Sequence, residues 1–173
     1  MIIGILGLAG SGKTLVAKHL VEEYEFERMR FADPIKRMLR LGLGLTDEEI
    51  DGENKMTPNS VFGGVTPRHL MQTLGTEWGR RNIHTDIWVN VWRRDVALQT
   101  GNVVVDDVRF PNEAAAIRAM GGVLWRVYRP GLTMDSHVSE RMQQNITEDH
   151  LINNATSITA LLNSTDHLIK NLA

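Results

Sequence analysis

Residues 7–14 read Gly-Leu-Ala-Gly-Ser-Gly-Lys-Thr and match the phosphate-binding pattern GxxxxGK[ST]. Glycines in such a loop let backbone N–H groups converge on phosphate oxygens without a Cβ in the way. Lys13 adds a cation for β and γ phosphates, and the Thr14 hydroxyl is a suitable Mg²⁺ ligand. The residues expected to hold a nucleotide here are Gly10, Ser11, Gly12, Lys13 and Thr14.

The flanking sequence contains the strand and the helix that this motif requires. Residues 1–6 form an apolar run typical of a buried strand, and residues 15–21 continue with helical spacing. A helix N-terminus directed at the loop adds a dipole that favours anions. Strand, loop and helix are thus all predicted, which favours nucleotide binding over a chance match.

Other polar residues follow further predicted strands. Asp33 follows a short alternating segment at 26–32, and Arg129 follows a strand at 123–128. Arg109 lies shortly after the β-branched run 103–105. Because carboxyl ends of parallel strands share one edge of a sheet, we expect these side chains near the phosphate loop. An ion pair with a neighbouring acid is the alternative for Arg109, and an exposed surface position is the alternative for Arg129.

Two adjacent acids, Asp106 and Asp107, end the β-branched run. In phosphate-loop folds this position carries the acid directed at magnesium. Strand alternation places the two carboxylates on opposite sides, so only one should face the nucleotide. We expect that one to be Asp107, because alternation puts it on the same side as Arg109.

The middle of the chain alternates between basic and acidic stretches. Residues 28–40 hold five basic side chains against one acid, which fits either an anion site or a solvated helix face. Asp33-Pro34 reads as a helix N-cap followed by proline at the first helical position. Residues 44–66 carry an acidic cluster with glycine and proline, and we expect an exposed insertion whose acids are solvated.

Two further predicted helices carry side chains that could contact a substrate. A helix from Thr66-Pro67 would place Arg68, Gln72 and Thr76 on one face, either as a binding surface or as a merely exposed face. A helix over 86–99 carries Trp88 and Trp92, a spacing more typical of a packed pair than of a base-stacking platform. Trp88 is retained as a candidate substrate contact.

Five predicted strands alternate with helices, which indicates an α/β fold of the P-loop NTPase type. Its five-stranded parallel sheet would be covered by helices on both faces. We expect one domain over residues 1–173, with a core at 1–43 and 101–173. A helical substrate-binding insertion is expected at about 44–100, and a polar lid at about 129–147.

Composition narrows the function further. The chain has 173 residues, a formal net charge of -2 and a pI near 6.3, which argue against a general nucleic-acid-binding surface. It contains no cysteine, so disulfides and cysteine-bound metals are excluded. No apolar run approaches the length of a membrane span. We therefore expect a soluble cytoplasmic protein without membrane or nucleic-acid partners.

Together these motifs resemble the phage-type deoxynucleoside monophosphate kinases, within the larger group of nucleoside monophosphate and dephospho-coenzyme A kinases. The resemblance covers most of the chain, and its blocks outside the phosphate loop are the more specific ones. These blocks are residues 31–36, Arg68 with residues 70–77, residues 107–113 and residues 137–140.

The resemblance implies magnesium-dependent transfer of the γ-phosphoryl group of ATP to a deoxynucleoside 5′-monophosphate. It implies that Lys13 serves the donor phosphates and that Arg109 and Arg129 bridge donor and acceptor. Asp107, in the third block, would face the nucleotide and its metal together with Thr14. Asn153 and Asn154 follow the last predicted strand, near 149–153, where related kinases hold adenine through the backbone, and Asn153 is the candidate; a simple turn is the alternative for their side chains. The resemblance also suggests a homodimer.

On the acceptor side, the resemblance implies that Lys36 and Arg68 grip the phosphate. Gln72 and Thr76 would contact the base or sugar, and Asp33 would orient the acceptor or a magnesium-bound water. It also implies a nucleotide-facing role for Ser139-Glu140, although a helix cap is the alternative there.

Two other functions remain open. A kinase with a hydroxyl acceptor, such as dephospho-coenzyme A, would need Asp33 as a general base. A non-catalytic nucleotide-dependent switch would use the phosphate loop only to order a neighbouring segment. The second cationic set, Lys36 and Arg68, argues against a switch, which has no need of an acceptor-phosphate pocket.

Overall fold

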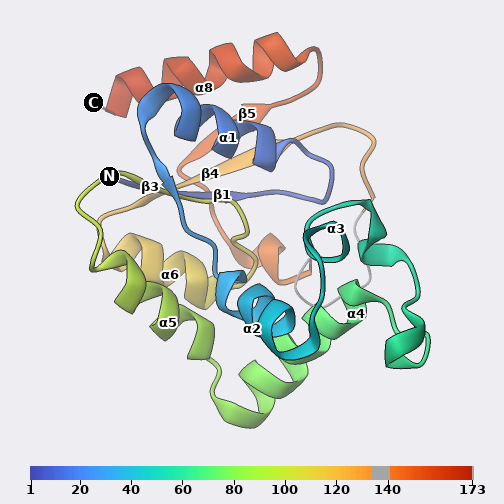
Figure 1. The fold of residues 1–173 in the computed structure, drawn as a ribbon. Helices are drawn as coiled ribbons and strands as arrows, with labels where there is room; N and C mark the ends of the chain where they lie inside the picture. The colour runs from blue at the N-terminus through green and yellow to red at the C-terminus, as the bar shows by residue number, and fades with distance from the viewer. Residues whose placement is uncertain (134–140, 173) are drawn as a thin grey trace. The chain divides into compact units, whose positions relative to one another are not determined.

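A parallel five-stranded sheet forms the centre of the computed structural model, which describes residues 1–133 and 141–172 (Figure 1). The strand order is β2-β3-β1-β4-β5. In the register, Ile3 of β1 lies opposite Val104 of β3 and Val123 of β4. The strands are β1 (Ile2–Leu6), β2 (Glu27–Arg28), β3 (Val103–Val105), β4 (Val123–Tyr128) and β5 (His150–Asn153). The predicted parallel sheet is confirmed, although the strand expected at 26–32 is much shorter.

Helices cover both faces of this sheet, as predicted. Helices α1 (Lys13–Tyr24) and α8 (Ile158–Leu172) pack on one face, and α6 (Pro111–Ala119) lies on the other (Figure 1). Apolar side chains of β1 and β3 point toward α1. They are buried in one core with side chains of α1 and α8. This core contains Ile3, Ile5, Val16, Ala17, Leu20, Val104, Trp125, Leu161 and Ile169 among others.

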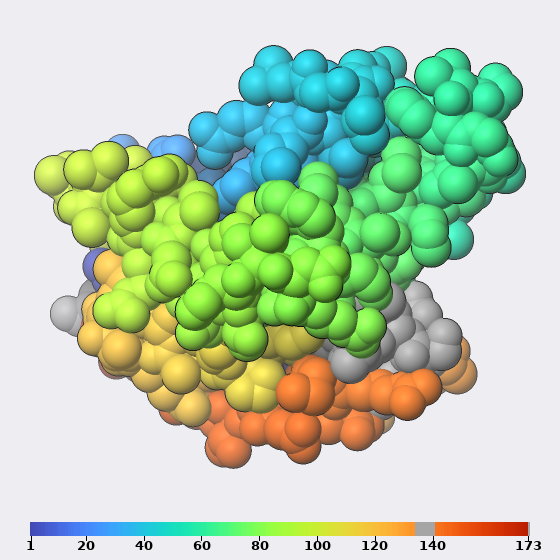
Figure 2. All heavy atoms as spheres, turned by 90° about the horizontal axis from the view of Figure 1, so that it is seen from below, coloured from blue at the N-terminus to red at the C-terminus, as the bar shows by residue number. Residues whose placement is uncertain are grey.

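The chain divides into two compact units, one formed by Met1–Arg30 with Arg93–Ala173 and the other by Phe31–Trp92. The second unit is helical, and Figure 2 shows its residues from light blue at α2 to green at η3. Its core contains Ile35, Leu39, Leu45, Ile50 and Trp88. Its elements are α2 (Asp33–Leu43), α3 (Asp47–Ile50), the 3-10 turns η1 (Glu53–Met56) and η2 (Ser60–Phe62), α4 (Pro67–Gln72), the π-helix η3 (Thr73–Ile83) and most of α5 (Ile87–Val96).

The expected domain roles remain predictions. The second unit begins at Phe31, earlier than the insertion expected at about 44–100, and ends at Trp92. The expected lid at 129–147 falls partly outside the described residues. His137 and Ser139-Glu140 are among the residues that lie outside them.

Two details of the second unit differ from the sequence-based expectation. Helix α2 begins at Asp33, so Ala32 occupies the N-cap position that we expected for Asp33. The segment after α2 contains a regular helix, α3, whose capping box joins Thr46 and Glu49 in both directions. Burial of the apolar Ile50 anchors this short helix in the core of the unit.

Across residues 1–133 and 141–172, no helix is long and apolar enough to cross a membrane.

Candidate functional site

The phosphate loop joins β1 to α1, as its flanking sequence predicted. Gly7 has a φ of 143°, and a Cβ at this position would lie 2.3 Å from the carbonyl oxygen of Val127. Both the backbone conformation and the close approach to β4 therefore require glycine. The N–H groups of the loop and the N-terminus of α1, which begins at Lys13, lie at the carboxyl end of β1. This is the arrangement expected for binding an anion.

Lys13 lies over the loop that precedes it. Its Nζ donates hydrogen bonds to the carbonyl oxygens of Gly7 at 2.8 Å and Leu8 at 2.7 Å. Because both acceptors belong to the loop, the ammonium group is held at the place where the loop can receive phosphate. The position fits the role predicted for Lys13 in binding donor phosphates.

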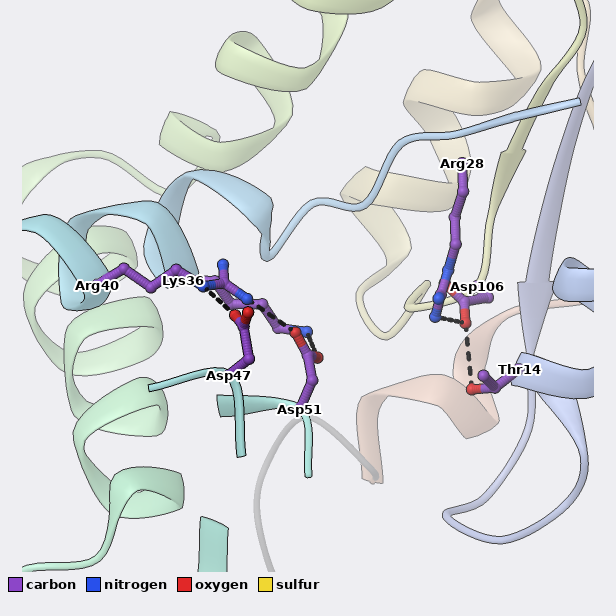
Figure 3. A network of polar contacts seen from close by, with 7 residues as sticks. All are labelled: Thr14, Arg28, Lys36, Arg40, Asp47, Asp51 and Asp106. Atoms are coloured by element: carbon purple, nitrogen blue, oxygen red, sulfur yellow. Dashed lines mark hydrogen bonds and ion pairs between the residues drawn. The ribbon is translucent and has the colours of Figure 1, made fainter. Parts of the chain in front are cut away.

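A buried carboxylate lies beside the first turn of α1 (Figure 3). The Thr14 Oγ1 donates to Asp106 Oδ2 at 3.3 Å, and Asp106 is only 5% exposed. The Arg28 Nε donates to Asp106 Oδ1 at 2.9 Å, and the Arg28 Nη2 bonds to Oδ2. The guanidinium fork thus holds both carboxylate oxygens.

The geometry favours Asp106 for the position that we expected Asp107 to occupy. Val104 packs in the core beneath α1, and the hydrogen bond from the Thr14 Oγ1 places the Asp106 carboxylate beside the first turn of α1. The role of Asp107 stays a prediction; its preference came from strand alternation with Arg109, which lies beyond the end of β3 at Val105. There the strand alternation no longer applies.

These residues fit a magnesium site of the kind that relies on substrate phosphates. Among the residues that the structure describes, no group of three or more His, Asp or Glu side chains could hold a metal. Mg²⁺ commonly uses one or two carboxylates with waters and phosphate oxygens. A hydroxyl that donates its proton to Asp106 keeps its oxygen lone pairs for a metal, so Thr14 can serve as a ligand.

A pocket of about 450 Å³ opens next to the phosphate loop. The Arg129 Nη1 lies 3.4 Å from the carbonyl oxygen of Gly10, as a long hydrogen bond. The Asn154 Nδ2 donates to the carbonyl oxygen of Ser11 at 2.8 Å. The pocket is lined by Gly10, Gly12, Leu15, Arg129, Pro130, Asn154, Ala155, Thr156, Ser157 and Ile158. Its size is that of a small-molecule site.

Asn154, rather than the predicted Asn153, lines this pocket. Asn153 is the last residue of β5 and is exposed, whereas Asn154 is partly buried and its N–H donates to the carbonyl oxygen of Tyr128 at 2.7 Å. The sequence placed the turn correctly but left the two neighbouring asparagines indistinguishable.

Arg109 and Asp107 lie in the segment between β3 and α6, and both are partly buried. The backbone N–H of Arg109 donates to Glu113 Oε2 at 2.7 Å, and the N–H of Phe110 donates to the same oxygen at 3.0 Å. The buried Glu113 carboxylate thereby fixes the entry into α6. This local anchoring positions the chain at Arg109 at the carboxyl edge of the sheet.

In the second unit, two basic side chains of α2 meet two acidic side chains of α3 and its C-cap (Figure 3). Lys36 pairs with Asp51. The Arg40 Nε donates to Asp47 Oδ1 at 2.7 Å, and the Arg40 Nη2 donates to Asp51 Oδ2 at 3.1 Å. Lys36 and Arg40 are four residues apart on α2, and Asp47 and Asp51 are four apart along α3 and its C-cap, so each pair shares one face. The prediction that these acids are merely solvated is wrong.

The face expected for Arg68, Gln72 and Thr76 is interrupted. The α-helical geometry of α4 ends at Gln72, and the chain continues as the π-helix η3. An i, i+4, i+8 alignment assumes 3.6 residues per turn, which a π-helix does not maintain. Arg68 and Gln72 are partly buried, while Thr76 is 8% exposed.

Trp88 lies in the core of the second unit. It is 3% exposed, and its Nε1 donates to the carbonyl oxygen of Gly75 at 2.7 Å. A Cβ at Gly79 would lie 2.6 Å from the Trp88 Cζ2, so the indole is packed directly against the π-helix. Trp92 instead contacts Phe31, with ring centroids 4.7 Å apart. Burial favours a packing role for Trp88 over the substrate contact considered from the sequence.

Sequence reasoning missed Arg28 and Gln143 as functional candidates. Arg28 was counted only within a basic stretch, and Gln143 lies in a polar segment that we assigned to the lid. The Gln143 side chain is 3% exposed, and its Oε1 accepts a hydrogen bond from the N–H of Gly7 at 2.9 Å. No spacing in the sequence links two residues so far apart.

Comparison with known proteins agrees with this arrangement. The family model described as deoxynucleotide monophosphate kinase matches residues 52–165. A protein of Acanthamoeba polyphaga mimivirus, provisionally described as a deoxynucleotide monophosphate kinase, is 36% identical over 90% of each chain. The deoxynucleoside-5′-monophosphate kinase of Escherichia phage T5 is 25% identical over 68% of this chain and 72% of the phage protein.

Solved structures share the fold at low sequence identity. Shikimate kinase from Aquifex aeolicus has a TM-score of 0.53 and 11% identity, covering 99% of this chain and 97% of its own. TT1252 from Thermus thermophilus has a TM-score of 0.57 and 14% identity, covering 100% and 98%. The fold is thus that of P-loop kinases, and the sequence matches show that the chain belongs to the deoxynucleotide monophosphate kinase family.

Proposed function

We propose that the protein transfers the γ-phosphoryl group of ATP to deoxynucleoside 5′-monophosphates and releases the diphosphates. Family membership supports this acceptor class. The observation that carries the donor half is the phosphate loop, with the Lys13 Nζ over it and the Thr14 hydroxyl on Asp106 beside it. The resulting enzyme is a phosphotransferase with a phosphate group as acceptor.

The chemistry of this reaction requires little proton transfer. A phosphomonoester has a second pKa of about 6, so at neutral pH the attacking oxygen is already largely ionised. The protein must instead hold two anions in line and neutralise charge as the phosphoryl group moves. Asp33 then has no need to act as a general base and is assigned to orienting the acceptor.

The donor side is assigned to residues of the first unit. Lys13 and the loop N–H groups bind the β and γ phosphates, and Arg129 with Asn154 lines the pocket for the rest of the nucleotide. Magnesium, when bound, neutralises phosphate charge, and we assign it to Thr14 with Asp106 as the orienting carboxylate. Asp107 stays the alternative carboxylate.

The acceptor side is assigned to residues of the second unit. Lys36 and Arg68 are proposed to bind the acceptor phosphate, and Gln72 and Thr76 the base or sugar. Arg109 and Arg129 are proposed to neutralise charge between the two phosphates, because a guanidinium fork matches phosphate oxygens. These roles rest on the resemblance of the sequence blocks.

The homodimer suggested by the resemblance remains a prediction that sedimentation equilibrium can test.

The direct test is an assay of the purified protein with ATP and magnesium against deoxy- and ribonucleoside monophosphates and dephospho-coenzyme A. Diphosphates from deoxynucleotides, absent with Lys13→Ala, are the expected result. Product from dephospho-coenzyme A alone would assign Asp33 the role of base, and ATP hydrolysis without any acceptor product would support a switch.

A second experiment tests the division into donor and acceptor residues. Arg68→Ala is expected to raise the KM for the acceptor at least about tenfold, since a charged hydrogen bond contributes about 1.5–3 kcal/mol, and to leave ATP affinity within about twofold. Equal losses for both nucleotides would mean that Arg68 is structural or belongs to the donor site.

A further inference from the structure

The phosphate loop begins with a buried N–H group that the sheet does not satisfy. Strand β1 pairs with β4 as far as Leu6 opposite Arg126, and Gly7 is the first residue beyond the strand. The N–H of Gly7 donates to Gln143 Oε1 at 2.9 Å, in a buried hydrogen bond. A side chain 136 residues away in sequence therefore provides the acceptor at the first position of the loop.

Gln143 is itself held in place by β4. It begins the 3-10 turn η4 (Gln143–Asn145). The Arg126 Nη2 donates to the carbonyl oxygens of Gln143 at 3.3 Å and Ile146 at 2.6 Å, and the Arg126 Nε donates to Glu148 Oε2 at 2.8 Å. Gln143, which begins the turn, and Ile146, which follows it, are both buried. The segment is thus attached to the sheet at several points.

Gly7 connects this segment to the lysine of the loop. Its N–H is bound by Gln143, and its carbonyl oxygen accepts from the Lys13 Nζ at 2.8 Å. Gly7 is also closely packed. A Cβ at this position would lie 2.3 Å from the Val127 carbonyl oxygen and 2.8 Å from the Ser11 Oγ. A shift of the Gly7 backbone would therefore displace the acceptor that holds the Lys13 ammonium.

We propose that Gln143 is a positioning residue that holds the start of the phosphate loop, and through Gly7 the Lys13 amine, in the geometry that binds nucleotide phosphates. This inference rests on the proposed ATP-binding role of the loop. The proposed role of Gln143 is to act through the backbone of Gly7, to which its side chain is bonded.

The test compares Gln143→Met with Gln144→Met. Methionine keeps the length and flexibility of the side chain but removes the strong oxygen acceptor, and Gln144 is the exposed neighbour on the same turn. Gln143→Met is expected to raise the Kd for ADP about tenfold, as expected when a buried donor loses its partner. The acceptor KM should stay within about twofold, and Gln144→Met should match the wild type in both.

A readout that needs no nucleotide is the exchange of the Gly7 amide proton, measured by NMR. Exchange should be faster in Gln143→Met than in the wild type and unchanged in Gln144→Met. If Gln143→Met does not fold, Gln143→Asn, shorter by one methylene, is measured in the same way.

A variant at Gln143 that lowers Tm but leaves ADP affinity and Gly7 exchange at wild-type values would overturn the proposal. Failure of the wild-type protein to bind ADP would instead contradict the proposed function, while Gly7 exchange would still test the role of Gln143 in holding the loop.

Discussion

The two charged networks in Figure 3 differ in the burial of their carboxylates rather than of their cations. In the first unit, Arg28 grips Asp106, whose side chain is 3% exposed. In the second unit, Arg40 pairs with Asp47, whose side chain is 85% exposed, and with Asp51, which is 38% exposed. Breaking a buried pair leaves an uncompensated charge, whereas an exposed pair exchanges its partner for water at little cost. The first network is therefore suited to fix a geometry, and the second to open for a ligand.

The largest effect is expected from Asp106→Asn, which breaks the buried network. Loss of the carboxylate should reduce turnover about 100-fold and raise the magnesium concentration needed for half-maximal rate, because the carboxylate that orients a metal ligand commonly contributes 10–100-fold. Stability should fall by about 2 kcal/mol, less than for a fully buried pair because the Arg28 side chain is 31% exposed. Magnesium titrations and urea unfolding measure the two effects.

Asp107→Asn is the matched control for this prediction. It removes a neighbouring carboxylate with the same chemical change, and we expect a smaller shift in magnesium dependence. If Asp107→Asn carries the magnesium effect while Asp106→Asn affects only stability, the buried network is structural and the original preference for Asp107 is restored.

A moderate effect is expected from Asp51→Asn, which breaks the exposed network. Lys36 and Arg40 would lose a competing carboxylate, so the KM for the acceptor should fall about two- to threefold while the KM for ATP stays constant. Stability should change by less than about 1 kcal/mol. Steady-state kinetics at low salt and at about 0.5 M added salt measure this effect. Salt screening should abolish the difference in acceptor KM between the variant and the wild type.

Glu48→Gln provides a control on the same helix, because Glu48 is exposed and has the same charge. Should Asp51→Asn raise the acceptor KM while Glu48→Gln does not, Asp51 would be part of the acceptor site rather than its competitor.

The smallest effect concerns acid stability at a third contact, between α1 and α8. His19 Nε2 lies 2.6 Å from Asp166 Oδ1, and this hydrogen bond holds the pKa of Asp166 below its ordinary value of 3.8. A depressed carboxyl pKa stabilises the fold above the unfolded value, and this contribution is lost as the pH falls through the folded value. Asp166→Asn should therefore cost up to about 1 kcal/mol at pH 7, and less below pH 3.8.

Urea unfolding of the wild type and Asp166→Asn between neutral and acid pH measures this difference. A constant difference at every pH would mean that the contact contributes packing rather than charge.

Local sequence patterns determined most elements of the sheet unit. The strand predicted at 123–128 is β4, and the helical spacing predicted at 15–21 lies within α1. Residues 7–14 identified the phosphate loop because its glycines, Lys13 and Thr14 lie close together in the sequence. Periodicity and turn chemistry depend on neighbouring residues, so they can be read without knowing the path of the chain.

Only the tertiary structure decided which of several equivalent residues meet. Asp106 rather than Asp107 faces Thr14 because α1 covers that side of β3, and Asn154 rather than Asn153 lines the pocket because β5 ends between them. Gln143 reaches Gly7 across 136 residues of sequence. The acids of α3 pair with α2 because the two helices present their charged faces to each other. Such contacts depend on how distant segments pack, and a periodic sequence is compatible with more than one packing.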